Sequence, residues 1–194
     1  LPDTITQIAA RAFEQCRGIR RMQLPAPDPA RNVPGLQRIG PMAFMNCRNL
    51  QSINLPDSIT EIGRGAFKYC TRLTQLVFPT NMQFFAILPE TCEMCTGLTH
   101  VVIPHTNQTI GMYAFGSCFS LTHVQLGNNL VRISNDAFSQ CTRLRYIGAG
   151  PNGNGTNNLP TTLHVLGVNC FIGCTALETI TLPNAVTTIP DGAF

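Results

Sequence analysis

Apolar residues along this chain recur at fixed offsets around a short phrase, Ala-Phe-x-x-Cys, which is followed by Leu three positions later. The Phe slots of successive copies hold Phe13, Phe44, Phe67, Cys92, Phe115, Phe138, Phe171 and Phe194. The commonest spacing between these slots predicts a unit of about 23 residues, and such self-similarity at a fixed period is typical of a repeat protein. The phrase positions that we expect to be structural are Phe13, Cys16, Phe44, Cys47, Phe67, Cys70, Cys95, Phe115, Cys118, Phe138, Cys141, Phe171 and Cys174.

A second phrase, Leu-x-x-Ile-x-Leu-Pro, follows each copy, as in Leu50, Ile53, Leu55 and Pro56. Its apolar and polar residues alternate with period two, which predicts a short, half-buried strand that Pro ends. The positions five and eight residues before each Phe slot are also apolar, with Asn107 as the one polar exception. The Ala-Phe-x-x-Cys phrase lies on the return path, where we expect a tight helical or irregular turn.

A unit of this length cannot bury its own apolar side chains, so neighbouring units must stack. The pattern therefore predicts an α/β repeat solenoid that is mainly β, a right-handed leucine-rich-repeat horseshoe with a parallel sheet on its concave side. Residues 1–194 are expected to form a single solenoid domain of about seven full repeats plus partial ends. Neither end shows a polar cap, which favours a longer repeat array or ends that other chains cover.

The consensus L-x-x-I-x-L-P-x-x-I-x-x-I-G-x-x-A-F-x-x-C, matched best by residues 50–70, resembles the BspA-like (Treponema pallidum type) leucine-rich-repeat family. The resemblance covers essentially the whole chain. It implies a binding role, as a surface antigen or adhesin of bacteria and parasites or as an interaction module of microbial eukaryotes. It transfers no catalytic residue.

Charge changes this picture in one respect. The formal charge is +3, and twelve of the thirteen basic residues are Arg, a side chain suited to bidentate contacts with carboxylates or phosphates at an interface. Ten basic residues fall within residues 1–72, together with five acids. Solvated edge residues are the alternative reading. No run of eighteen apolar residues and no signal-like start is present, so the sequence predicts no membrane span in this segment.

The nine cysteines invite a disulfide or metal interpretation, but seven of them occupy one repeat slot. We expect a ladder of buried, reduced thiols, because neighbouring parallel side chains rarely meet disulfide geometry. Cys92 and Cys95 match C-x-x-C, yet Cys92 fills the Phe slot and no second pair completes a metal site. A G-x-G-x-x-G pattern starts at Gly148, but no helix follows it. The sequence thus predicts no metal, no cofactor and no enzyme.

The solvent-facing strand positions form two columns with valines at the centre and amides, His, Tyr and Arg around them, a composition typical of a protein interface. His100 and His123 occupy the same slot in adjacent repeats and could respond to pH near 6 to 7. Few lysines and no aromatic stacking series argue against nucleic acid. The candidate partner-binding residues are Arg21, Gln23, Ser52, Asn54, Gln75, Val77, His100, Val102, His123, Gln125 and Tyr146, with Thr179 and Thr181 next in the columns.

Length variation is confined to the link after the strand, where insertions follow Pro25, Pro79 and Gly150. These insertions should emerge at one edge, and we expect Asp28, Arg31, Asn152 and Asn154 to contact a partner there, with tolerated surface variation as the alternative. The sequence therefore predicts a protein-interaction scaffold, alone or as a subunit of a larger assembly. The alternative is an extracellular adhesin, in which the sequons at Asn107 and Asn154 could carry glycan.

Overall fold

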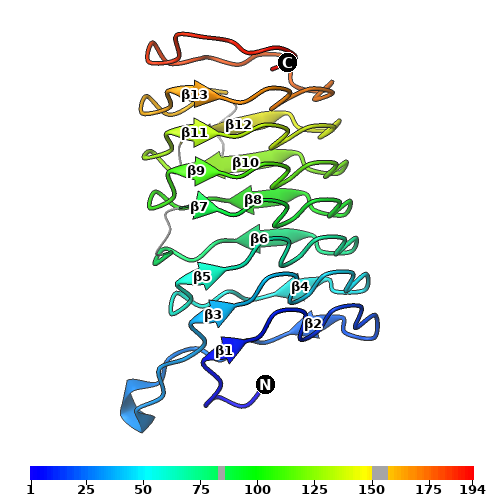
Figure 1. Ribbon diagram of the computed structural model, residues 1–194, viewed down its shortest axis with the longest axis vertical. Helices are drawn as coiled ribbons and strands as arrows, with labels where there is room; N and C mark the ends of the chain where they lie inside the picture. The colour runs from blue at the N-terminus through cyan, green and yellow to red at the C-terminus, as the bar shows by residue number, and fades with distance from the viewer. Residues whose placement is uncertain (83–85, 150–156) are drawn as a thin grey trace.

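Most repeats contribute two short strands, and these pair in parallel with strands of neighbouring repeats to form four sheets of two to four strands in the part of the chain that the structure describes. This arrangement is seen in a computed structural model that describes residues 1–82, 86–149 and 157–194. The coils stack into a ladder with two columns of strands and a column of turns (Figure 1). The chain is thus a parallel-sheet solenoid, mainly β, with the repeat length expected from the sequence, and the predicted fold class is confirmed.

The strand predicted from the Leu-x-x-Ile-x-Leu phrase forms the first column, which we call the main sheet. Its central side chains, such as Leu76 and Val101, are buried, and the residues on either side point outward. The register pairs Gln75 with His100 and Val77 with Val102. The strands are β2 (Arg21–Met22), β4 (Ser52–Ile53), β6 (Gln75–Val77), β8 (His100–Val102), β10 (His123–Leu126) and β12 (Tyr146–Ala149).

The second column was not predicted as strand, although its apolar position was identified. Each of its strands has only two residues, one outward and one buried in the core, which is too short for an alternating pattern to show. The strands are β1 (Gln7–Ile8), β3 (Arg38–Ile39), β5 (Glu61–Ile62), β7 (Ala86–Ile87), β9 (Thr109–Ile110), β11 (Arg132–Ile133) and β13 (Val165–Leu166).

The Ala-Phe-x-x-Cys phrase forms an irregular turn. Gly65 and Tyr69 adopt left-handed backbone conformations, each with a φ of 63°, and the same two slots repeat this in the other units. These conformations aim alternate N–H groups at the next coil: the Phe44 N–H donates to the Ala66 carbonyl and the Asn46 N–H to the Lys68 carbonyl, both at 2.8 Å. The described residues contain one short helix, the 3-10 turn η1 (Pro29–Arg31).

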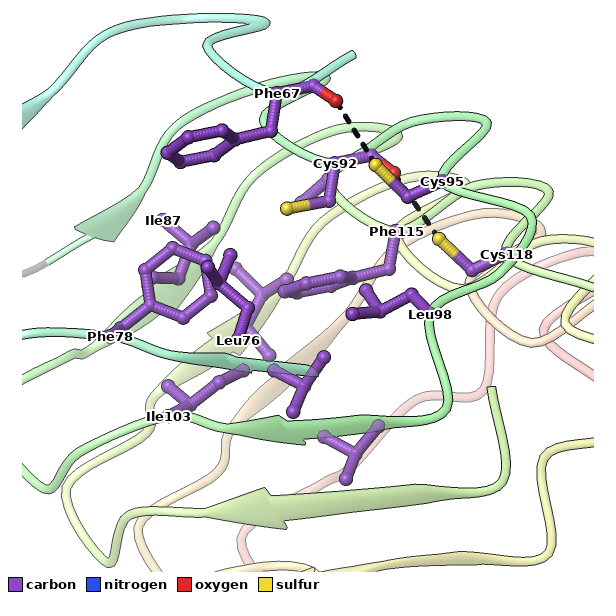
Figure 2. Close-up of a cluster of buried hydrophobic side chains, with 14 of the residues drawn as sticks. Phe67, Leu76, Phe78, Ile87, Cys92, Cys95, Leu98, Ile103, Phe115 and Cys118 are labelled. Atoms are coloured by element: carbon purple, nitrogen blue, oxygen red, sulfur yellow. Dashed lines mark hydrogen bonds between the residues drawn. The ribbon is translucent and has the colours of Figure 1, made fainter. Parts of the chain in front are cut away.

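Phenylalanine rings stack through the core, coil upon coil. The rings of Phe13 and Phe44 lie 5.2 Å apart at 3°, and those of Phe138 and Phe171 lie 5.5 Å apart at 4°. Cys92 interrupts this stack in the fourth unit. There, the Phe78 ring packs edge-on against Phe115 with centroids 6.1 Å apart, beside the small Cys92 side chain (Figure 2). Phe78 therefore supplies the aromatic volume that the Phe slot lacks.

The cysteine slot is a ladder of hydrogen-bonded thiols. From Cys47 onward, each Sγ of this slot donates to the carbonyl of the Phe slot one coil earlier, as in Cys95 to Phe67 at 3.0 Å and Cys118 to Cys92 at 3.2 Å (Figure 2). All nine cysteines are free, and all except the half-buried Cys16 are buried. Burial raises the pKa of Cys47 to about 11, so that thiol stays protonated at neutral pH.

The end of the third insertion enters the main sheet. The Asn158 carbonyl accepts from Ala149 N–H at 3.1 Å, and Asn158 bridges in parallel to Thr181, so residues 157–159 lie between β12 and residues 179–181. The expectation that Thr179 and Thr181 directly continue the two columns was therefore wrong. The cause is the buried Asn157, whose side-chain amide donates to the carbonyls of Arg145 and Thr179.

Candidate functional site

The outward side chains of the main sheet form one surface, which we call the main-sheet face. Arg21 pairs with Ser52, and a second run pairs Gln75, His100, His123 and Tyr146 side by side across four coils. Val77 is the most open apolar residue there, with 60% of its surface exposed, and Val102 beside it is half-buried. The remaining predicted positions on this face are Gln23, Asn54 and Gln125, of which Gln23 is exposed and the other two are half-buried.

Asn54 differs from the other predicted partner-binding residues because its amide is already engaged. Its Oδ1 accepts from the Leu24 N–H at 2.7 Å, and its Nδ2 donates to the Leu24 carbonyl at 3.2 Å. This side chain thus connects β2 and β4 where the first insertion departs. We assign Asn54 a structural contact in addition to its place on the face.

Three rings stack at the centre of the face. The His100 and His123 rings lie 4.8 Å apart at 8°, and the rings of His123 and Tyr146 lie 4.7 Å apart at 32°. No aromatic series was expected here from the sequence, because the two histidines were predicted to lie side by side as a polar patch and Tyr146 was not considered with them. The facing sides of these rings cover one another, so a base cannot insert between them, and the rings offer hydrogen-bonding edges instead.

Threonines behind the rings determine which nitrogen is free. Thr99 Oγ1 donates to the Thr74 carbonyl at 3.0 Å, and Thr122 Oγ1 donates to the Thr99 carbonyl at 3.0 Å. The His100 and His123 Nδ1 atoms lie 2.9 and 2.8 Å from these hydroxyls. Because each hydroxyl proton is already used, each Nδ1–H must donate, which leaves Nε2 as an outward acceptor. Partial burial, with smaller effects from His100 and Arg145, lowers the pKa of His123.

Charge is segregated between the two sides of the solenoid. The stretches that run from each turn through its main-sheet strand are residues 17–24, 48–55, 71–78, 96–103, 119–126, 142–149 and 175–182, which we call the main-sheet segments. They contain seven arginines and one acid, Glu178, a net charge of +6. The rest of the chain holds six basic and nine acidic residues, a net charge of −3.

The acids that pair with basic residues lie outside the main-sheet segments. Lys68 contacts Glu90 at 2.9 Å and Glu93 at 2.7 Å, both on the turns, and this contact with Lys68 lowers the pKa of Glu90. Arg64 also pairs with Glu90. Among the ion pairs between described residues, none uses an arginine of the main-sheet segments. The positive charge of this side is therefore not neutralised within the described part of the chain.

A depression of about 620 Å³ lies where the first main-sheet segments begin. Two exposed guanidinium groups, those of Arg21 and Arg72, line it. Gly97 lines it as well, and a larger residue would not fit there, because its Cβ atom would lie 2.6 Å from the Thr71 carbonyl oxygen. The full lining is Arg21, Gln51, Ser52, Thr71, Arg72, Thr74 and Gly97.

Comparison with known families decides what kind of scaffold this is. Six copies of the unit described as BspA type leucine rich repeat region match the chain, over residues 1–86, 29–145 and 85–194. The chain belongs to the BspA-type leucine-rich-repeat family. The match spans the described solenoid from its first strand to its last turn, so the resemblance seen in the consensus is confirmed.

Solved structures of leucine-rich-repeat proteins share this fold. A leucine-rich-repeat protein of Treponema pallidum superposes with a TM-score of 0.75 at 28% identity, over 92% of this chain and 76% of that one. A leucine-rich-repeat protein of Eubacterium ventriosum gives a TM-score of 0.70 at 22% identity, over 91% of this chain and 42% of that one. No curated protein matches the chain in sequence.

The edge of this BspA-type solenoid holds only part of the predicted loop site in described residues. In the first insertion, Arg31 Nε lies 2.6 Å from Asp28 Oδ2, and Arg31 Nη1 lies 2.7 Å from Asp3 Oδ2. Asp28 also caps η1, so both predicted residues hold the loop in shape while remaining accessible. Asn152 and Asn154 lie outside the described residues.

Across residues 1–82, 86–149 and 157–194, no group of three or more His, Cys, Asp or Glu side chains is placed to hold a metal ion. Cys92 and Cys95 are buried, and burial raises the pKa of Cys92 well above its usual range. None of the described helices has the length and apolarity to cross a membrane.

Proposed function

We propose that this chain is a non-enzymatic protein-interaction scaffold that binds a partner protein on its main-sheet face, with the edge loop around Asp28 and Arg31 as a second contact. The observation that carries this proposal is Val77, which is 60% exposed on a rigid strand next to Val102. An apolar centre on a fixed sheet, rimmed by polar side chains that can rotate, has the composition of an interface core.

The polar side chains around Val77 and Val102 support the same function. Both histidines present Nε2 as an acceptor, and Gln75 beside His100 can donate or accept. Coils that share a parallel sheet move little relative to one another, so these groups are held at fixed spacing before a partner arrives. Such preorganisation lowers the cost of ordering an interface on binding. We propose on the same ground that residues 1–194 act as one domain.

A face-specific cross-linking experiment tests the proposal. A photoreactive amino acid is placed at Val77 on the main-sheet face and, as the matched control, at Val131, which is 38% exposed beside the second column of strands. After irradiation in the source cells, we expect a discrete protein adduct from position 77 and none from position 131. Adducts of equal yield at both positions, or none at position 77, would exclude the main-sheet face as the binding surface.

Membership of the BspA-type family favours one more specific candidate, a cell-surface adhesin. Export would place the nine free thiols in an oxidising environment, where burial and raised thiol pKa values would have to protect them. Digestion of intact source cells with a protease distinguishes the two settings. An exported adhesin is cleaved on intact cells, whereas an internal scaffold is cleaved only after lysis.

A further inference from the structure

Two arginines of the main-sheet segments, Arg21 and Arg72, face neutral residues in the adjacent coils. Arg72 lies between Asn49 and Gly97 in the adjacent coils, and Arg21 stands beside Ser52. No carboxylate of the described residues pairs with either guanidinium. Five of the seven arginines, Arg17, Arg20, Arg21, Arg48 and Arg72, fall in the first three main-sheet segments, which contain no acid.

The depression between Arg21 and Arg72 opens to solvent, and its lining combines polar and apolar surface. The hydroxyls of Thr71 and Thr74 already donate to the carbonyls of Arg48 and Gln51, so the charged donors that remain for a ligand are the two guanidinium groups, with the Gln51 and Ser52 side chains beside them. A guanidinium binds carboxylates in a planar, two-pronged geometry. The depression therefore suits one or two carboxylates that enter from solvent.

We propose that the main-sheet face binds an acidic polypeptide segment, whose carboxylates occupy the depression between Arg21 and Arg72 while an apolar side chain of the same segment packs on Val77. This inference rests on the proposed function and specifies the partner's chemistry. Arg72 and Val77 belong to one coil and are five residues apart, about 16 Å in extended chain. An extended partner segment would therefore carry its apolar residue about five positions from its acidic residues.

The apolar centre favours a polypeptide over other polyanions. A sulfated glycan or a nucleic acid would use the arginines but would have no group to pack on the exposed Val77. The three central rings are stacked on one another, so a base cannot insert between them. An acidic peptide uses both the arginines and the valine, and its carboxylates can also accept hydrogen bonds from polar groups at the rim.

The test measures the anisotropy of a fluorescein-labelled twelve-residue peptide that contains two adjacent glutamates and two adjacent valines five positions later. The intact protein is compared with the double variant Arg21→Gln/Arg72→Gln. The matched control is Arg38→Gln/Arg132→Gln, which removes the same charge from exposed positions of the second column. Melting curves establish that all three proteins are folded. A peptide with glutamines in place of the glutamates measures the part of binding that does not depend on charge.

We expect saturable binding of the acidic peptide that weakens about five- to tenfold in Arg21→Gln/Arg72→Gln and less than twofold in the control variant, since exposed charge pairs contribute modestly to each contact. Equal weakening in both variants, equal binding of the glutamine peptide, or binding of a heparin decasaccharide without binding of the peptide would overturn the inference. If the acidic peptide does not bind while cross-linking at position 77 still gives an adduct, only this inference is refuted. If position 77 gives no adduct, the proposed function is refuted as well.

Discussion

The Phe78 side chain packs beside the slot in which Cys92 replaces phenylalanine, and substitutions at these two positions give the sharpest test of how this core is packed. In the fourth unit a cysteine occupies the slot that holds phenylalanine elsewhere, and the Phe78 ring lies against Phe115, within 6.1 Å, next to the space that a phenylalanine at position 92 would fill. Cys92 and Phe115 are fully buried and Phe78 is 2% exposed, so no side chain can turn into solvent without losing its packing.

Restoring the repeat consensus at position 92 should therefore destabilise the protein. Cys92→Phe adds a ring to a filled site, and overpacking of this kind costs about 1–3 kcal/mol. Phe78→Leu alone removes part of the ring and leaves a partial cavity, at a cost of about 1–2 kcal/mol. In the double variant the new ring can enter the stack between Phe67 and Phe115, so we expect stability within about 1 kcal/mol of the original and a coupling energy of about 2 kcal/mol.

Urea unfolding of the four proteins measures this coupling from the midpoints at a common slope. The matched control combines Cys92→Phe with Phe171→Leu, another ring of the stack that lies farther along the solenoid. Because distant substitutions add, this pair should show a coupling near zero. If the Cys92/Phe78 pair is also additive, Phe78 does not fill the position-92 space and the compensation argument is refuted.

The other predictions concern single groups. Asn107 is fully buried and its amide has no hydrogen-bond partner among the described residues, so Asn107→Leu should raise the unfolding free energy by about 2 kcal/mol. Asn157→Leu should lower the unfolding free energy instead, because the Asn157 side chain makes three hydrogen bonds. A less stable Asn107→Leu protein would contradict this reasoning. Alkylation at pH 8 followed by mass spectrometry should modify at most Cys16 in the folded protein and all nine thiols after denaturation, and modification of Cys70 in the native state would contradict the buried ladder. The pKa of His123 is lowered in the folded state, so the unfolded chain takes up a proton first as pH falls below about 6.5. Stability should decline between neutral and mildly acidic pH; His123→Asn should reduce this decline in melting temperature and His105→Asn should not.

The sequence was sufficient for the parts of the fold that every unit repeats. Leu50, Ile53 and Leu55 repeat the same spacing seen in other units, and because each unit must cover its neighbour, that spacing predicts the main sheet, its register and the Phe and Cys slots. The second column of strands could not be predicted, because two-residue strands such as β5 carry a single buried residue each. Its existence depends on inter-coil hydrogen bonds, such as Gly63 N–H to the Ile39 carbonyl at 2.8 Å, which no sequence periodicity records.

Features that occur once were harder to predict. The bridge between Asn158 and Thr181 lies inside an insertion, where neighbouring coils set the pairing and no repeated apolar pattern marks it. The stacked rings of His100, His123 and Tyr146 follow from register, but two residue types had to be considered together to see them. Phe78 supplies the aromatic side chain that Cys92 lacks, from a different slot of the repeat. The pattern within either slot alone does not reveal this pairing.

Core residues and outward residues occupy different slots of the repeat, and this explains why the charge of the main-sheet segments bears on function. The fold is specified by the Leu, Ile, Phe and Cys slots, while the outward slots between them are free to vary, as Arg21, Ser52 and Gln75 in one column demonstrate. A net charge of +6 without counterions among the described residues opposes folding by self-repulsion, and nothing in the packing of the coils requires it. Charge that the fold does not need is best accounted for by what the face binds. Removing Arg21 and Arg72 should therefore cost the solenoid little or no stability, so any loss of binding in that variant reflects the contact itself.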